Sequence, residues 1–370
     1  MSAAVLVIGA GISGATVARR LADAGRDVVV IDEARHVAGN CHTEIDPETG
    51  VLIHRFGPHI FHTDDDAVRD FLARFALFEP YRHRVFAVAN GQFFRLPINL
   101  HTLSQFFGRV FTPDEARAHL ESVASTGADA DSFEARALEL MGPDLYAAFF
   151  QGYTRKQWGC DPAELPSSIL RRLPFRFDAD DNYFHHTFQA LPHKGYTHLI
   201  ETMLNDDQIQ LRLGLAAEAV GLEDFAHVFH SGAIDRHYKY QFGALSYRTL
   251  QFEDRAVDGD FQGTPVVNYC DQDIQHTRIT EHRHLAPWRL YKGKGVISIE
   301  TSHAAQPGDR LYYPVHRKVD LERLDLYCQL AEAEQNLTFV GRLGRYTYID
   351  MDLACRQALD AADDYLDRNG

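Results

Sequence analysis

Three glycines near the start of the chain have the spacing of a pyrophosphate-binding turn. Gly9, Gly11 and Gly14 follow an apolar run that begins at Val5, and they precede a segment predicted to be helical from about Ala15. In such a turn the first glycine allows a tight bend, the second lets the backbone approach the phosphates, and the third lets the helix pack on the strand. Because the helix N-terminus then faces the anion, we expect a nucleotide diphosphate to bind here.

The elements around this turn complete a strand, helix, strand unit. A second apolar run, Val28–Asp32, follows the predicted helix, and its terminal acid lies 18 residues after Gly14. An acid at that place can accept a hydrogen bond from a ribose hydroxyl of a dinucleotide. The complete setting favours a Rossmann-like dinucleotide-binding domain over a chance cluster of glycines.

The loop after the second strand resembles a further part of flavoprotein cofactor sites. In flavoproteins of the two-dinucleotide-binding type, an arginine followed by a turn of small residues lies against the cofactor phosphates. Arg35 with Gly39 and Asn40 resembles that arrangement, although Ala38 stands where the first glycine of the turn is usual. A phosphate contact is still expected at this loop.

Histidine and cysteine residues could suggest metal or thiol chemistry, but their pattern argues against both. His59 and His62 are three residues apart, yet the adjacent Gly-Pro turn disfavours a helix and no third ligand stands at helical spacing. Hydrogen-bonding or pocket-lining roles are therefore favoured, and no metal is expected. The cysteines lack a CxxC pair and are expected to be free thiols in a reducing cytoplasm; they are Cys41, Cys160, Cys270, Cys328 and Cys355.

The size and charge of the chain restrict its class. With 370 residues it exceeds the roughly 250 to 300 at which a single hydrophobic core stops growing, so two or three domains are expected. A formal net charge of −15 argues against binding to nucleic acid or to an anionic membrane, because both require a basic face. No leader and no apolar run of roughly 20 residues is seen, which predicts a cytoplasmic protein without a membrane span.

Turn residues and hydrophobic periodicity predict the remaining elements. Asn90-Gly91 marks a hairpin within 83–97, and Thr112-Pro113 begins a helix with a capping residue. A Gly-Arg-Leu-Gly turn is expected at 341–344. The other predictions are helices over 65–76, within 101–165, over 197–204 and 318–335 and from about 352, strands over 51–59, 208–213, 227–232 and 337–340, and an antiparallel sheet within 243–300.

Several linked motifs resemble the bacterial UDP-galactopyranose mutase family, from Val5 to about Leu359. The most specific is Gly152-Tyr-Thr-Arg-Lys-Gln-Trp158. The sequence departs from the family pattern mainly between residues 283 and 305, and this leaves the sugar open. The other stretches that carry the resemblance are the glycine turn, 56–64, 96–100, 149–159, 172–176, 181–184, 277–281, 311–314 and 340–350.

The resemblance implies an α/β fold with three parts. These are a discontinuous FAD-binding Rossmann-like domain of the two-dinucleotide-binding type, a helical insertion domain with a mobile lid, and a six-stranded antiparallel β-sheet domain. The approximate ranges expected are 1–76, 192–232 and 330–370 for the FAD-binding domain, 100–165 for the helical substrate-binding domain, and 77–99, 166–191 and 233–329 for the sheet domain.

The implied function is the interconversion of UDP-galactopyranose and UDP-galactofuranose, in galactofuranose biosynthesis for a cell wall or polysaccharide. Members of the family work with reduced flavin, whose N5 forms a covalent adduct with the anomeric carbon as UDP leaves. NADPH or NADH as reductant and a homodimer are expected by the same analogy. The sequence has no serine elbow and no metalloprotease signature, as expected where the cofactor carries the chemistry.

The resemblance also implies which residues form the site. Arg172 resembles the family's mobile-loop arginine and Arg278 its fixed one, and a guanidinium suits a departing diphosphate because it can grip phosphate oxygens bidentately. Arg176 competes with Arg172 for that assignment, and Phe150 and Tyr153, three apart on a helix, could stack on uracil. The substrate-binding residues implied are Phe150, Tyr153, Thr154, Trp158, Tyr183, Asn268, Tyr313, Tyr348 and His62. The cofactor-binding residues implied are Gly9, Gly11, Ser13, Gly14, Asp32, Glu33, Arg35, Gly39, Asn40, His59, Gly341, Arg342, Tyr348, Asp350 and Met351.

Other functions compete with this one. A mutase of a related nucleotide sugar, such as UDP-N-acetylgalactosamine, would use the same residues. A flavin oxidoreductase of the amine-oxidase type shares the glycine turn and a Ser231-Gly232 strand end, but it needs nothing of the 149–159 segment. A non-catalytic flavin- or nucleotide-sugar-binding protein is disfavoured, because the two arginines and the three tyrosines of the motifs are kept.

Overall fold

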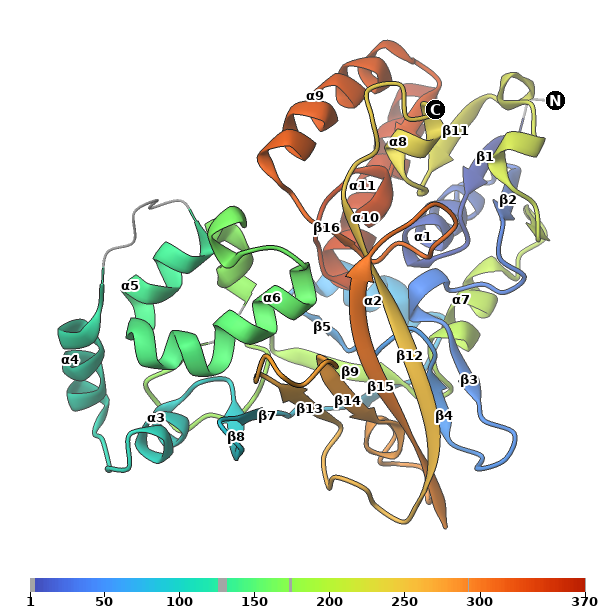
Figure 1. The fold of residues 1–370 in the computed structure, drawn as a ribbon. Coiled ribbons are helices and arrows are strands. Elements are labelled where there is room, and N and C mark those ends of the chain that lie inside the picture. The colour runs from blue at the N-terminus through green and yellow to red at the C-terminus, as the bar shows by residue number, and fades with distance from the viewer. Residues whose placement is uncertain (1–3, 126–131, 173–174, 292, 370) are drawn as a thin grey trace.

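A parallel sheet of five strands holds the N-terminus of the chain (Figure 1). The protein is described by a computed structural model over residues 4–125, 132–172, 175–291 and 293–369, without the side chains of residues 171 and 172. The first strand is buried at every position, as expected for a parallel strand covered on both faces. The strand order is β10 (Ile209–Leu213), β2 (Val28–Asp32), β1 (Val5–Ile8), β11 (His227–His230) and β17 (Leu337–Phe339).

Three helices pack with this sheet and complete the predicted Rossmann-like domain, which is confirmed. They are α1 (Ile12–Asp23), α7 (Tyr196–Leu204) and α11 (Met351–Asn369), and α1 contacts both of the others. The first helix begins at Ile12 rather than near Ala15, because the Ala15 amide already donates to the Gly11 carbonyl at 2.9 Å. The helix therefore starts inside the glycine turn, and its first amides belong to that turn.

A second sheet has seven strands where six were expected, and one of its pairs is parallel. Strand β13 runs parallel to β7, while the other pairs are antiparallel. A long excursion of the chain separates these two strands, which gives the crossover that a parallel pair needs. The order is β16 (Tyr313–Pro314), β12 (Tyr247–Asp258), β15 (Lys294–Ala304), β14 (Arg278–Glu281), β13 (Val266–Tyr269), β7 (Val85–Ala89) and β8 (Gln92–Leu96). The hairpin predicted at Asn90-Gly91 joins β7 to β8 and is confirmed.

A helical lobe lies to one side of the two large sheets, coloured teal to green in Figure 1. The capping residue predicted at Thr112 is confirmed, and it is part of a capping box: its hydroxyl accepts from the Glu115 amide, while the Glu115 carboxylate accepts from the Thr112 amide. Within this lobe six residues form a π-helix, a rare element that often marks functional sites. The elements are α3 (Leu100–Phe106), α4 (Pro113–Val123), α5 (Phe133–Leu145), the π-helix η2 (Tyr146–Gln151), α6 (Gly152–Trp158), and the 3-10 turns η3 (Pro162–Glu164) and η4 (Ser167–Arg172).

Smaller elements connect these parts. One prediction is corrected here: 341–344 forms a short helix, α10 (Gly341–Gly344), rather than an open turn, because the Arg345 amide donates to the Gly341 carbonyl at 3.1 Å. The small sheets are β3 (Thr43–Ile45) with β4 (Leu52–His54), and β5 (Phe61–Thr63), β9 (Phe188–Pro192) and β6 (Phe78–Pro80). The remaining helices are α2 (Asp66–Ala73), α8 (Ile234–His237), α9 (Lys318–Ala333), η1 (Gly39–Cys41), η5 (Ala217–Ala219), η6 (Leu222–Asp224) and η7 (His282–Leu285).

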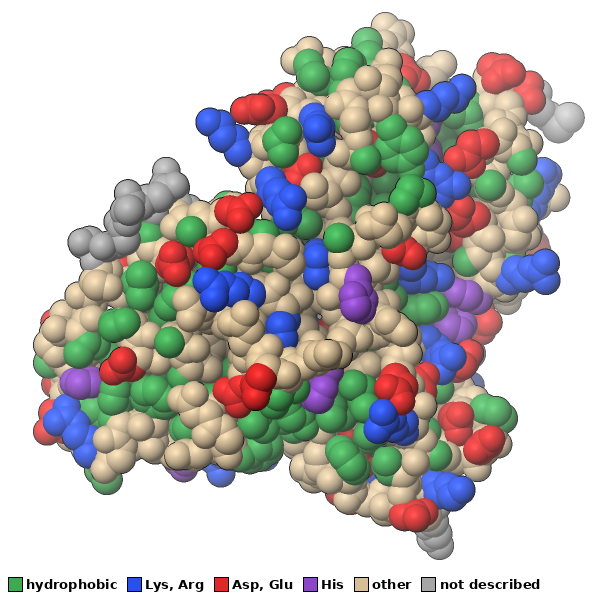
Figure 2. All heavy atoms as spheres, in the orientation of Figure 1, with side chains coloured by type: hydrophobic (Ala, Val, Ile, Leu, Met, Phe, Trp, Pro, Cys, Tyr) green, Lys and Arg blue, Asp and Glu red, His purple; other side chains and the backbone are tan. Residues whose placement is uncertain are grey.

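The surface and the thiols agree with the composition. Acidic and basic side chains are interspersed over the face in Figure 2, which carries no continuous basic patch. All five cysteines are free thiols, as predicted. Over the described residues, none of the helices has the length and apolar character needed to cross a bilayer.

An ion pair between Asp65, at the start of α2, and Arg356 of α11 makes the stability of the protein depend on pH. Asp65 caps α2, and its carboxylate accepts from Arg356 Nε at 2.7 Å. The Arg356 hydrogen bond lowers the pKa of Asp65 to about 2, so this contribution is complete above the ordinary pKa of roughly 4 and is lost as the pH falls through about 2. Because both side chains are about a third exposed, we expect about 1 kcal/mol at neutral pH.

The Arg356→Gln variant should accordingly melt about 1–2 °C below the wild type at pH 7, and the difference in melting temperature should be about half as large at pH 3. Thermal unfolding at the two pH values measures this. Arg368→Gln, on the same helix, is the control, because Arg368 donates to a backbone carbonyl rather than to a carboxylate. An equal deficit at both pH values would contradict the linkage.

Candidate active site

The glycine turn at the end of β1 leaves almost no room for side chains. Gly9 has a φ of +104°, and a Cβ there would lie 2.0 Å from Ser231 Oγ, just after β11. A Cβ on Gly14 would lie 1.9 Å from the Gly9 carbonyl oxygen. The structural roles predicted for these two glycines, a tight bend and close packing of the helix, are confirmed.

Two distant segments complete a cradle around this turn. A Cβ on Gly341 would lie 2.8 Å from Ser13 Oγ, so the start of α10 packs on the start of α1. A Cβ on Gly11 would lie 3.9 Å from the Cα of Gly39, so the turn after β2 faces the glycine turn. These approaches bare the backbone beside the N-terminus of α1, which is the arrangement that a pyrophosphate requires. The residues present therefore fit a dinucleotide cofactor.

Asp32 holds the turn in shape. Its Oδ2 accepts from the Ala10 amide at 2.7 Å, and its Oδ1 accepts from the Ala34 amide at 2.8 Å. Ala38 adopts a left-handed φ of 74°, which explains why a glycine is usual at that place. The loop thus has the left-handed conformation at this position although alanine stands there instead of glycine.

The other polar residues predicted to contact the cofactor have different surroundings. Asn40 Nδ2 donates to the Leu311 carbonyl at 3.0 Å and so joins the loop before β16 to the cradle. Glu33 and Arg35 are exposed, and Glu33 pairs with Arg236 at 2.9 Å. The structure therefore places Glu33 and Arg35 on the surface and Asn40 at a loop contact.

A cavity of about 1150 Å³ opens where the cofactor domain, the helical lobe and the seven-stranded sheet meet. It exceeds the roughly 300–1000 Å³ typical of a site for one small ligand, so it has room for an extended ligand beside a second group. Each residue predicted to bind substrate lines it: His62, Phe150, Tyr153, Thr154, Trp158, Tyr183, Asn268, Tyr313 and Tyr348. It is also lined by Arg278 and by four predicted cofactor residues, His59, Arg342, Asp350 and Met351.

Three aromatic rings form one wall of the cavity. Trp158, at the end of α6, packs edge-on to Tyr348 with ring centres 5.6 Å apart, and Tyr348 does the same with Tyr313 at 5.3 Å. The Arg342 guanidinium lies 5.2 Å from the Tyr348 ring and donates to the Ile349 carbonyl at 2.7 Å. The wall therefore joins the helical lobe to the segment that follows α10.

The aromatic face predicted for Phe150 and Tyr153 is built differently from an ordinary helix. Phe150 lies in the π-helix and Tyr153 in the α-helix that follows, and both line the cavity. Phe150 is largely buried in the core of the lobe. Burial raises the pKa of Tyr153, so its phenol is neutral and can donate a hydrogen bond to a ligand.

Arg278 is a largely buried cation that lines the cavity. It begins β14, and its Nε lies 3.1 Å from Oε1 of Glu300 on the neighbouring strand β15. Burial lowers the pKa of Arg278, but the Glu300 carboxylate and the neighbouring tyrosines together outweigh burial, so the pKa of Arg278 is raised. Burial also raises the pKa of Glu300. Glu300 also accepts from the Thr277 hydroxyl at 3.2 Å. The pair thus presents a fixed guanidinium to a ligand.

Arg172 and Arg176 are the two alternatives for the mobile-loop arginine, and an ion pair disfavours Arg176. Arg176 is buried and does not itself line the cavity; its Nη1 lies 2.5 Å from Oδ2 of Asp180, and its Nη2 lies 3.2 Å from Nδ1 of the lining residue His185. It is therefore committed to structure. The Arg172 side chain lies outside the described residues, so its assignment stays a prediction.

Polar atoms without protein partners line the cavity, and they include residues that the sequence did not single out. Within the described chain, His83 Nδ1, Gln157 Oε1 and Asn268 Oδ1 are buried there and have no hydrogen-bond partner. Burial, aided by nearby Arg278, lowers the pKa of His83 to about 3, so its ring is neutral. A buried polar atom left unpaired costs about 1–3 kcal/mol, which a polar ligand would recover.

Comparison with known proteins identifies the family. A model of UDP-galactopyranose mutase matches residues 148–348, and one of NAD(P)-binding Rossmann-like domains matches residues 7–75. The chain is 48% identical to a probable UDP-galactopyranose mutase of Klebsiella pneumoniae, over 98% of this chain and 94% of that protein. The protein belongs to the UDP-galactopyranose mutase family.

Other relatives show how broad this family is. A dTDP-fucopyranose mutase of Escherichia coli is 45% identical over 99% of both chains, and a UDP-galactopyranose mutase of Mycoplasma pneumoniae is 31% identical over 98% of this chain and 96% of that protein. A crystal structure of reduced UDP-galactopyranose mutase aligns with a TM-score of 0.78 at 14% identity, over 99% of this chain and 94% of that chain. Putrescine oxidase bound to putrescine aligns at 0.58 and 11%, over 99% of each chain, which shows the shared fold alone.

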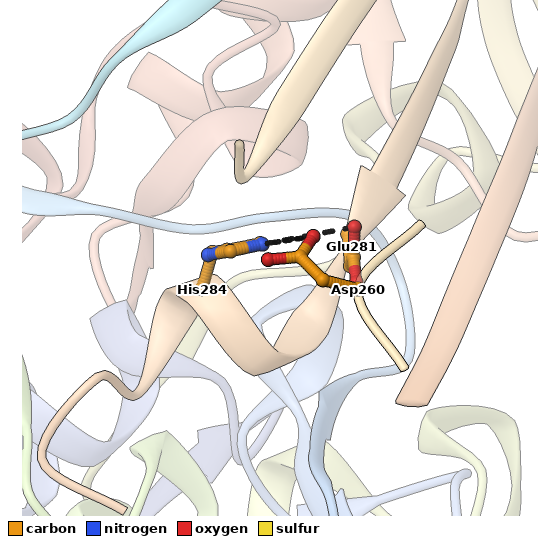
Figure 3. Close-up of side chains that lie close together, drawn as sticks. All are labelled: Asp260, Glu281 and His284. Carbon is orange, nitrogen blue, oxygen red and sulfur yellow. Dashed lines mark hydrogen bonds and ion pairs between the residues drawn. The ribbon is translucent and has the colours of Figure 1, made fainter. Parts of the chain in front are cut away.

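This mutase-family member also has a cluster of possible metal ligands outside the cavity. Among the described residues, the group that could share an ion is Asp260, Glu281 and His284, drawn in Figure 3. His284 Nε2 lies 3.0 Å from Asp260 Oδ1 and 3.7 Å from Glu281 Oε2. Glu281 is buried and accepts from the amides of Phe261 and Gln262. These contacts account for the cluster as a brace of the loop between β12 and β13.

The Arg278–Glu300 pair gives a testable expectation. Glu300→Gln keeps the shape of the side chain but leaves a buried guanidinium without its counter-charge, so we expect a loss of about 3 kcal/mol of stability. A displaced guanidinium should also lower kcat/KM roughly tenfold. Thermal unfolding and steady-state kinetics measure the two effects. Glu253→Gln, at an exposed ion pair on β12, is the matched control; equal behaviour of the two variants would contradict the role of the pair.

Proposed function

We propose that this protein interconverts UDP-galactopyranose and UDP-galactofuranose with FAD bound in the glycine cradle. Membership of the mutase family supports the reaction, and the shape of the cradle supports the cofactor. The observation that carries the proposal is the convergence of Arg278, the aromatic wall and the segment after α10 on one cavity. A reduced flavin would supply the nucleophile for the anomeric carbon, so the protein needs no nucleophile of its own.

The residues of the chain would then bind, orient and neutralise. Arg278 suits the diphosphate, because a fixed guanidinium can hold phosphate oxygens that gain charge as the sugar leaves. Phe150 and Tyr153 suit the uracil ring, since both bring aromatic surface to the cavity. The unpartnered atoms of His83 and Asn268 suit sugar hydroxyls, because both are buried and lack partners in the described protein.

The test is turnover with and without reduction of the flavin. Purified protein is incubated with UDP-galactofuranose, either untreated or with dithionite, and UDP-galactopyranose is followed by chromatography. We expect product only in the reduced sample. Activity in the oxidised sample, or none in the reduced one, would refute the proposal for this substrate.

A second candidate substrate is a dTDP-linked 6-deoxy sugar, because the relative named dTDP-fucopyranose mutase is nearly as similar as the first and spans the same length. The same assay with dTDP-fucofuranose distinguishes the two, and UDP-N-acetylgalactosamine is a third substrate to try. Oxygen consumption during turnover would instead support the oxidoreductase alternative, which rests on the fold alone.

The setting of the reaction is inferred from the family. We infer a cytoplasmic homodimer that serves galactofuranose biosynthesis for a cell wall or polysaccharide, with NADPH or NADH as reductant of the flavin. Light scattering of the purified protein tests the dimer. Anaerobic bleaching of the flavin by each nicotinamide tests the reductant.

A further inference from the structure

Helix α6 contacts the seven-stranded sheet through one face. Gly152 and Lys156 are four residues apart, so they lie on the same side of the helix, and Gly159 caps its C-terminus in a left-handed conformation. A Cβ on Gly152 would lie 2.5 Å from the Cys270 carbonyl oxygen, and a Cβ on Gly159 would lie 2.1 Å from Arg248 Nη1. The helix therefore packs so closely on the sheet that neither Gly152 nor Gly159 leaves room for a side chain.

Lys156, in the middle of this face, is surrounded by backbone carbonyls. Its Nζ lies 2.7 Å from the carbonyl oxygen of Tyr269, 2.8 Å from Asp271, 2.9 Å from Ile274 and 3.2 Å from His276. Among the described residues, no carboxylate lies within 4.0 Å of it, so the four carbonyls are its ligands. An ammonium group has three protons to share among them. Tyr269 is the last residue of β13, and the other three carbonyls belong to the loop that joins β13 to β14.

A second cation holds the same helix from the opposite direction. Arg248 of β12 is buried and donates from Nε to the Gln157 carbonyl at 3.0 Å and from Nη2 to the Lys156 carbonyl at 3.3 Å. Ser302 of β15 also donates to the Gln157 carbonyl, at 2.7 Å. Lys156 of the helix thus donates to carbonyls of the sheet domain, and Arg248 of the sheet donates to carbonyls of the helix.

The loop around Lys156 connects two residues of the site. Asn268 lies near the end of β13 and Arg278 opens β14, and both line the cavity together with Tyr153 and Trp158 of α6. We propose that Lys156 is a positioning residue: its carbonyl cage is a built-in monovalent-cation site that fixes the spacing between the α6 wall and the Asn268–Arg278 wall. The inference rests on the proposed function, because it concerns how that cavity holds its substrate.

The proposal predicts a specific kinetic signature. Lys156→Met keeps an unbranched side chain as far as Cε but removes the charged Nζ, so the carbonyls lose their shared ligand and we expect the two walls to separate. A displacement of about 1 Å can cost roughly 100-fold in rate, so we expect kcat/KM to fall by about 10–100-fold with a raised KM. A purely structural loss would reduce the amount of folded, flavin-loaded enzyme and leave the KM of that fraction unchanged.

Chemical rescue tests the cage itself. Lys156→Ala removes three methylenes and the ammonium, which n-propylammonium replaces atom for atom. We expect n-propylammonium chloride to restore at least a tenth of the lost kcat/KM, whereas sodium chloride at equal ionic strength and n-propanol restore none. Arg155→Met is the matched control, since Arg155 pairs with Asp161 instead of the loop, and its kinetics should equal those of the wild type. A wild-type KM in Lys156→Met, or no rescue of Lys156→Ala, would overturn the proposal.

Two further measurements keep the inference separate from the proposed function and from failures of folding. Wild type inactive on every nucleotide sugar would count against the proposed function; hydrogen exchange of residues 269–277 then decides, because Lys156→Met should speed it and unchanged protection would overturn the cage. If the Lys156 variants do not fold, Gly152→Ala disturbs the same contact by one methyl group. A wild-type KM and wild-type exchange in that variant would overturn the proposal.

Discussion

An Arg278→Ala variant is expected to keep its flavin and to lose turnover, with kcat/KM lower by roughly 10²–10³-fold. The Arg278 side chain is 22% exposed, and it lines the cavity from β14. Glu300 fixes its direction from the neighbouring strand, so its charge needs no rearrangement when a diphosphate gains charge. The glycine cradle is a separate part of the molecule, which is why flavin binding should survive. Kinetics of the reduced variant and its visible flavin absorbance measure both outcomes.

Two further variants make this expectation specific. Arg278→Lys keeps a charge but loses the planar fork, so it should recover only part of the activity. Arg255→Ala removes an arginine from an exposed pair on β12 and should change nothing. Arg172→Ala is expected to behave like Arg278→Ala on the motif alone. Loss of flavin in Arg278→Ala, or near-normal turnover, would show that the arginine does not serve the substrate.

The parts of the fold that the sequence predicts well are those with local causes. The glycine turn, the hairpin at Asn90-Gly91 and the cap at Thr112 each follow from conformational preferences of a few adjacent residues. Motifs extended this to the cavity, because residues named from separate stretches line it together. The resemblance to the family made this prediction possible, because the spacing of these residues in the sequence does not show that they meet at one cavity.

Other features depend on contacts between distant segments and could not be read locally. The parallel pairing of β7 with β13 appears only when both ends of a long excursion meet. His83 and Glu300 are single polar residues in or beside apolar strands, and their importance follows from burial in the cavity. The π-helix before α6 likewise has no simple sequence pattern. Each of these features depends on tertiary contacts. The local conformational preferences of the residues are compatible with them but do not predict them.

Replacing Gly14 by alanine is expected to give a protein without bound flavin and therefore without activity. The added Cβ would lie 1.9 Å from the carbonyl oxygen of Gly9 and 3.0 Å from its carbonyl carbon, and these backbone atoms cannot move aside without opening the turn. Opening the turn would separate α1 from β1 and take the helix N-terminus away from the pyrophosphate. The ratio of flavin absorbance to protein absorbance, measured after purification and again after incubation with excess FAD, reports the loss.

Gly25, two residues after the C-terminal end of α1, supplies the control for this expectation. It has a φ of +75°, and nothing lies within 4 Å of a Cβ placed there. Gly25→Ala therefore adds backbone strain just after α1 without a collision, and this variant should bind flavin as the wild type does. A yellow, active Gly14→Ala protein would mean that the turn can widen and still bind the cofactor. A colourless Gly25→Ala protein would mean that strain near α1, rather than the collision at the turn, releases the flavin.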